Sequence, residues 1–192
     1  MHALREYLAK RAERCSSSSP RAAPRRNRLL VELIACTGLR CSEAARLLVG
    51  DVVLEGVDPH VRIRGGKKRA PKVVETVPIP FGLVGMLRAF VHELAQDRPV
   101  FENQHGHALS RQRLWEIVKT GWRAVGARSV LNVHALRHWF ISQVAAHPKA
   151  GPWEVARLAR MRDLSTVLVY FHSRSGRELS DSLSPGSRPL RK

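Results

Sequence analysis

The chain has 192 residues, enough for one ordinary domain, and 44% of them are hydrophobic, which excludes a protein disordered by composition. It carries 33 Lys and Arg against 16 Asp and Glu, so the net charge is +17, and residues 29–172 keep +8 of it without the two ends. Such an excess points to a polyanion, most often nucleic acid; the alternative is a charge kept only for solubility.

The cysteines and the hydropathy of the chain indicate the cellular compartment in which we expect the protein. Cys15, Cys36 and Cys41 form no C-x-x-C pair and leave an odd count. No secretory signal is recognisable at the N-terminus, so reduced thiols in the cytoplasm are the simplest interpretation. The longest apolar stretch, Leu29–Cys36, is interrupted by Glu32 and is far too short to span a bilayer. We therefore expect a cytoplasmic protein that does not enter the membrane.

Residues 1–26 are predicted to form an N-terminal helix and a flexible basic linker. The stretch Ala3–Arg14 favours a helix, with Leu4, Tyr7 and Leu8 on one face. Ser16–Arg26 has a serine run, two prolines and no apolar periodicity, which is typical of a linker. An ordered domain is expected over residues 27–172, followed by a polar C-terminal tail over residues 173–192.

Within residues 27–172 the pattern predicts mostly helices. Gly38 is expected to end the first helix, and Ser42 is expected to cap the second. Two short strands flank a basic turn. The predicted fold class is therefore mainly α with a small antiparallel β-sheet (α+β). The helices are expected at residues 28–36, 43–48, 81–95, 110–125, 134–146, 152–161 and 165–172, and the strands at 61–64 and 73–78.

Two arginines are candidates for binding a phosphate. Arg40 follows the predicted helix end, and Arg137 lies three residues after His134, so Arg137 and His134 share a helical face. A guanidinium offers planar, bidentate donors and stays charged at any working pH. Two of them could therefore stabilise the extra negative charge of a phosphorane-like transition state without a metal. Glu43 is expected to orient Arg40 rather than to cancel its charge.

The predicted hairpin is strongly basic, with six Lys and Arg among residues 62–72. Lys67 is placed to protonate a departing 5′ oxygen as a general acid, and Lys68 is the alternative. The other four are candidate DNA-binding residues, although a solvated turn that touches phosphates non-specifically would look the same. These four are Arg62, Arg64, Arg69 and Lys72.

Tyr170 is the candidate nucleophile and His134 its candidate base. A phenol has a pKa of about 10 and needs a base or nearby cations before it attacks. Imidazole titrates near neutrality, so His134 could take that proton or orient the phosphate. His134 and His138 have a spacing that can bind zinc, but no glutamate follows His134 and no third ligand is evident. Neither a metal nor a cofactor is predicted.

Together these motifs resemble the catalytic domain of tyrosine site-specific recombinases, the phage-integrase family. TGLRCSEAARL is similar to its first arginine box, GGKKRAPKVVETVPIP to its lysine hairpin, HALRH to its H-x-L-R-H box and DLSTVLVYFH to its D-x-x-T-x-x-x-Y box. The resemblance covers residues 27–172, which would be the catalytic domain. It implies integration or recombination of double-stranded DNA through a 3′-phosphotyrosine on Tyr170, without a cofactor and usually within a tetramer on two DNA sites.

Two departures from the family pattern leave alternatives open. Met161 stands nine residues before Tyr170, where the family usually has His or Trp, and a thioether cannot donate a hydrogen bond. Cleavage would be slowed, or Arg160 or Arg162 would take over the contact. The chain also offers at most one short helix where family members usually carry an N-terminal helical clamp. A non-catalytic, degenerate DNA-binding relative and a type IB topoisomerase are the two alternative functions.

Overall fold

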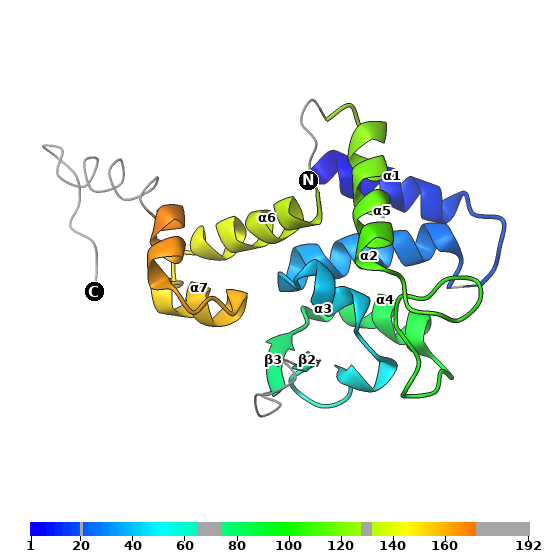
Figure 1. Ribbon diagram of the computed structural model, residues 1–192, viewed down its shortest axis with the longest axis horizontal. Coiled ribbons are helices and arrows are strands. Elements are labelled where there is room, and N and C mark those ends of the chain that lie inside the picture. The colour runs from blue at the N-terminus through cyan, green and yellow to red at the C-terminus, as the bar shows by residue number, and fades with distance from the viewer. Residues whose placement is uncertain (20, 65–73, 128–131, 172–192) are drawn as a thin grey trace, which may run out of the picture. The chain divides into compact units, whose positions relative to one another are not determined.

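The computed structural model describes residues 1–19, 21–64, 74–127 and 132–171 (Figure 1). The chain forms two compact units, Met1–Phe140 and Ile141–Lys192. The described residues are mostly helical with one small antiparallel sheet, which confirms the predicted fold class. None of the helices in this described part combines the length and the apolar character needed to cross a bilayer.

The first unit begins with a helix that is part of its core. Helix α1 (His2–Glu13) packs against α2 (Ala23–Thr37) and α5 (Arg111–Ala124), as Figure 1 shows. Leu4 and Leu8 are buried against these helices, which confirms the predicted apolar face. Their burial anchors the N-terminal helix in the same core as α2.

Helix α2 begins five residues earlier than the pattern predicted. Pro24 lies in its first turn, where the φ angle of proline suits the helix and no N–H is needed, so the proline belongs to the helix rather than to a linker. Its end is as predicted, because Gly38 follows as a left-handed cap with φ 63°. The division of the chain into a linker and a catalytic domain stays a prediction.

Helix α3 (Cys41–Ala45) is shorter than predicted, and its cap was predicted wrongly. The N-cap is Arg40 rather than Ser42, because the Glu43 carboxylate accepts the backbone N–H of Arg40 at 2.7 Å. This hydrogen bond starts the helix two residues before the predicted first residue. The helix ends at Ala45, and three residues later the extended backbone of Leu48 pairs with Pro99.

The sheet has three antiparallel strands in the order β1–β2–β3. Val61 and Val77 lie opposite each other and both are buried, while Arg62 and Arg64, which alternate with the buried residues of β2, are exposed. Both predicted strands are confirmed, and a third was missed because two residues are too few to show alternation. The strands are β1 (Val52–Val53), β2 (His60–Arg64) and β3 (Val74–Pro78).

As far as the residues are described, the later helices begin and end within two residues of the predicted bounds, except at the end of α4. Helix α4 ends at Val91 rather than Ala95, because His92 has an extended ψ of 134° and Glu93 a positive φ of 60°. Ser110, predicted as the first residue of the next helix, is instead the N-cap of α5, since its side chain accepts the N–H of Arg113. Residues 164–171 are also helical. The bounds are α4 Phe81–Val91, α6 Val133–Ala145 and α7 Pro152–Ala159, with a 3-10 turn at Val49–Asp51.

Candidate active site

Arg137 is a buried cation on α6, with 4% of its surface exposed. Helix α6 is capped by Asn132, whose Oδ1 accepts the backbone N–H of His134 at 2.8 Å. The Arg137 Nη1 donates to the backbone carbonyl of Gly38, which lies 99 residues earlier in the chain. A buried charge must be hydrogen-bonded to be tolerated, so this contact fixes Arg137 at the place where α2 ends.

Gly38 allows this contact for two reasons. It ends α2 in the left-handed conformation, with φ 63° and ψ 24°, and its N–H donates to the carbonyl of Ile34 at 2.8 Å. A Cβ on Gly38 would lie 2.3 Å from Cδ1 of Phe140, so the Phe140 ring packs directly on the glycine backbone. Only glycine accommodates both the positive φ and this close approach.

Arg40 is held by Glu43 at the start of α3. The two carboxylate oxygens of Glu43 accept the backbone N–H and the Nη1 of Arg40, each at 2.7 Å. The Glu43 side chain is 10% exposed and that of Arg40 is 45% exposed. A guanidinium can bind a carboxylate along one edge and a phosphate oxygen along another. The geometry therefore suits an arginine that is oriented by Glu43 and presented to an anion.

His134 and His138 lie together on the exposed face of α6. Their rings meet edge to face, with centroids 4.7 Å apart. Partial burial lowers the pKa of His134 below its usual value, and the charges of His138, Arg137 and Arg40 lower this pKa further. His134 is therefore neutral near pH 7 and able to accept a proton. The structure brings these four residues and Glu43 together within the first unit.

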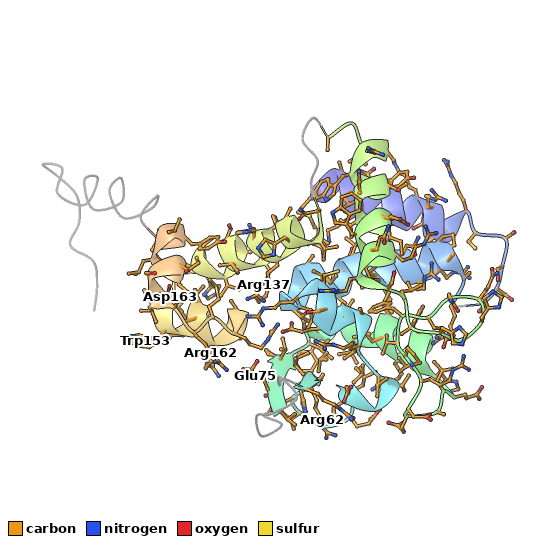
Figure 2. All side chains as sticks on the ribbon, viewed as in Figure 1. Arg62, Glu75, Arg137, Trp153, Arg162 and Asp163 are labelled. Atoms are coloured by element: carbon orange, nitrogen blue, oxygen red, sulfur yellow. The ribbon has the colours of Figure 1, made fainter. Side chains whose placement is uncertain are left out.

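The two strand arginines differ in their surroundings. Arg62 is exposed on β2, as Figure 2 shows. Arg64 is also exposed, but its Nε donates to Oδ1 of Asp51 at 2.7 Å. Asp51 is 2% exposed, and its other oxygen accepts the N–H of Leu48 at 3.2 Å. This ion pair ties the end of β2 to the 3-10 turn. The remaining hairpin candidates, Lys67, Lys68, Arg69 and Lys72, lie outside the described residues.

In the second unit, Tyr170 is half-buried on the helical segment 164–171. Asp163 precedes that segment, as Figure 2 shows, and its carboxylate accepts the Oγ of Ser165 at 2.7 Å and the N–H of Ser165 at 2.9 Å. These hydrogen bonds lower the pKa of Asp163. Asp163 therefore acts as the N-cap of the segment that carries the candidate nucleophile.

Met161 lies in the turn between α7 and residues 164–171. Its backbone N–H donates to the carbonyl of Ala156 at 2.9 Å, and Arg160 before it has a left-handed φ of 53°. Arg162, labelled in Figure 2, is exposed. The turn therefore carries a thioether flanked by two cations, and only the cations can donate hydrogen bonds to a phosphate.

Comparison with known proteins identifies the family of the chain. Residues 3–177 match the model of the phage integrase family. The chain belongs to this family. It is 31% identical over 154 residues to the tyrosine recombinase XerD of Lacticaseibacillus casei, over 77% of this chain and 50% of XerD. XerD of Mycobacterium leprae is 33% identical over 174 residues, 78% of this chain and 53% of the relative. The chain thus spans about half the length of these relatives.

Solved structures of similar proteins share the fold. The site-specific recombinase XerH, in a pre-cleavage complex with its difH substrate, superposes with a TM-score of 0.71 at 26% identity. This match covers 96% of this chain and 52% of XerH. A lambda integrase dimer bound to a COC′ core site gives a TM-score of 0.62 over 86% of this chain and 45% of the integrase. At 15% identity, the second match supports the fold alone.

One residue and two contacts in this phage integrase family member were not included in the predicted site: the cap Asn132, the ion pair of Asp51 with Arg64, and the contact of Arg137 with Gly38. Asn132 could have been found, because an asparagine just before a predicted helix is a common N-cap. The pairing of Asp51 with Arg64 and the contact of Arg137 with the Gly38 carbonyl leave no local signal, since both join segments that meet only in the fold. These contacts determine how the predicted residues are held.

Proposed function

We propose that this chain is the catalytic part of a tyrosine recombinase that cleaves and rejoins double-stranded DNA at specific sites. The observation that carries the proposal is the junction of α2 and α6. There the buried Arg137 donates to the Gly38 carbonyl, which lies two residues before Arg40 in the chain. The charge of Arg137 also acts on His134. Membership of the phage integrase family supports the same function.

In the proposed reaction the two arginines bind the non-bridging oxygens of the scissile phosphate. Arg40 and Arg137 are fixed before the reaction, so they stabilise the developing charge with little reorganisation. His134, neutral because its pKa is lowered, accepts the phenolic proton as Tyr170 attacks phosphorus. Lys67, or Lys68 in its place, gives a proton to the departing 5′ oxygen.

The products of this step are a 3′-phosphotyrosine on Tyr170 and a free 5′-hydroxyl. One phosphoester bond forms as another breaks, so the reverse step rejoins DNA without an external energy source or a cofactor. A homotetramer on two DNA sites would exchange strands between the two steps. The proposed backbone contacts come from the exposed Arg62, together with Arg64, Arg69 and Lys72.

A suicide-substrate assay tests the enzyme class. A nicked duplex carrying the candidate site, or the flanking DNA if the site is unknown, is incubated with the protein and run on a denaturing gel. We expect a covalent protein–DNA band for the unaltered chain and none for Tyr170→Phe. Relaxation of plain supercoiled plasmid without any special site would instead indicate a topoisomerase.

Met161 favours a second candidate function, a non-catalytic DNA-binding relative, because its thioether cannot donate to the phosphate. The variant Met161→His restores a donor at this position, and we expect it to form adduct faster than the unaltered chain. If neither protein forms adduct on DNA that both bind, the result supports the non-catalytic DNA-binding function. If Met161→His gives no gain while the unaltered chain cleaves, Arg160 or Arg162 is the next donor to test by substitution with Gln.

A further inference from the structure

Arg5 of α1 makes a partly shielded ion pair with α2. Its Nε donates to Oε2 of Glu32 at 2.8 Å, and its Nη2 donates to the same oxygen. Nη2 also lies 3.6 Å from Sγ of Cys36, one helical turn further along α2. The Glu32 side chain is 13% exposed and that of Arg5 is 36% exposed. The hydrogen bonds that Arg5 donates to Glu32 raise the pKa of Arg5, so the guanidinium stays charged at any working pH.

The same guanidinium reaches a third helix. Its central carbon lies 5.7 Å from the ring centroid of Trp139 on α6, within the range of a cation–π contact. Trp139 directly follows His138 and lies two residues after Arg137. Two residues turn an α-helix by roughly 200°, so Trp139 and Arg137 point to nearly opposite sides of α6. The helix is therefore contacted on one side by Gly38 and on the other by Arg5.

We propose that Arg5 is a positioning residue for the reaction proposed above. It couples Glu32 of α2 to Trp139 of α6 and so holds the turn that carries Arg137 and His138 from the side opposite Gly38. The inference rests on the proposed function, because that function is what makes the placement of α6 matter. A shift of 1 Å in a reacting group can cost about 100-fold in rate, so a contact outside the site can control cleavage.

Arginine suits this role better than lysine. A planar guanidinium can hydrogen-bond to Glu32 along its edge while its face lies over the Trp139 ring, whereas an ammonium is a point charge without a face. Arg5→Lys should therefore keep the ion pair and lose most of the ring contact. Trp139→Leu keeps an apolar side chain on α6 and removes the ring. These two variants separate the two contacts that Arg5 makes.

The test compares Arg5→Gln with a matched control on the same helix. Lys10 also forms an ion pair, with Glu6 at 2.7 Å, but both side chains are exposed and neither is on α2 or α6. We expect Arg5→Gln to slow single-turnover adduct formation about 10-fold and to leave DNA affinity unchanged. Lys10→Ala should change neither. In a double-mutant cycle, Arg5→Gln and Trp139→Leu should not be additive in cleavage rate.

A second readout keeps the test independent of cleavage. The imidazole resonances of His134 and His138, assigned by NMR, should shift in Arg5→Gln and stay in place in Lys10→Ala. If the unaltered chain forms no adduct, the proposed function fails, but these resonances still report whether Arg5 positions α6. If Arg5→Gln does not fold, Arg5→Lys and Trp139→Leu carry the same measurements. If the histidine resonances do not shift and the effects of Arg5→Gln and Trp139→Leu on cleavage rate are additive, Arg5 is not a positioning residue.

Discussion

At the scale of single residues, Gly38 determines whether α2 and α6 can meet. The positive φ costs any other residue about 1–2 kcal/mol, and a Cβ would force the Phe140 ring aside. We predict that Gly38→Ala lowers the free energy of unfolding by about 2 kcal/mol or more and slows adduct formation, because the carbonyl that holds Arg137 moves. Denaturant unfolding and the adduct assay measure the two effects.

Gly85 is the matched control for this substitution. It lies within α4, and a Cβ there would meet no atom within 4 Å. Because alanine is a better helix former, Gly85→Ala should raise the free energy of unfolding by about 0.5–1 kcal/mol. If Gly38→Ala and Gly85→Ala lower the free energy of unfolding equally, the left-handed conformation of Gly38 does not contribute to stability.

The imidazole of His134 gives a prediction about pH. Its pKa lies below the usual 6.5, mainly through partial burial and then through the charges of His138, Arg137 and Arg40. We predict that His138→Gln raises the pKa of His134 towards the usual value, because one of these charges is removed. An NMR titration of the His134 ring measures this change. A pKa that stays unchanged would mean that the edge-to-face pair has no electrostatic consequence.

The same shift has a consequence for stability. Between the lowered pKa of folded His134 and the usual 6.5, the unfolded chain binds more protons than the folded chain. The free energy of unfolding should therefore fall as the pH is lowered from 6.5 through the folded pKa, and His134→Gln should remove that part of the slope. Denaturation curves collected across this range provide the comparison.

At the scale of elements, the sequence was sufficient where local signals determined the structure. The helix that ends at Gly38, the helix of residues 110–125 and the strands β2 and β3 were all predicted from adjacent residues. Some wrong predictions were local, as at the cap of α3, where Glu43 accepts the N–H of Arg40, but other features depend on distant contacts. Helix α3 is shorter than predicted, and Leu48 after it pairs with Pro99. The helix and apolar face of α1 were predicted, but its partners α2 and α5 were not. No window of local sequence contains those partners.

The helical segment 164–171 gives the prediction that belongs to this scale. Asp163→Ala removes the acceptor for the N–H of Ser165 and should let the start of the segment fray, since its first N–H groups lose their cap. We expect faster amide hydrogen exchange over residues 164–171 and slower adduct formation through Tyr170. Mass spectrometry after deuterium labelling measures the exchange.

Glu154→Ala supplies the control in the same unit. Glu154 accepts the N–H of Gly151 at 3.0 Å and so caps α7 rather than the segment that carries Tyr170. Its loss should speed exchange at the start of α7 and leave residues 164–171 protected as before. Should both variants expose the same residues, the unit opens as a whole and Asp163 has no specific effect on the tyrosine helix.

At the scale of the whole molecule, the charge of +17 predicts how binding depends on salt. Each DNA phosphate neutralised by a cation releases counterions, so the affinity falls steeply as salt rises. We expect the chain alone to bind DNA weakly at physiological salt. Nanomolar affinity for one sequence under those conditions would contradict this expectation and would imply extensive readout of bases.

A substitution of Arg62 tests which surface of the protein produces the salt dependence of DNA binding. It is exposed on the outer face of β2, so Arg62→Ala should lower the slope of log affinity against log salt by about one phosphate contact without unfolding the sheet. Lys10→Ala removes the same charge from α1 and should leave that slope unchanged. A salt titration of both variants on one duplex makes the comparison. If the two slopes fall equally, the charge acts through the overall field of the molecule; if only Arg62→Ala changes its slope, the β2 face contacts the DNA backbone.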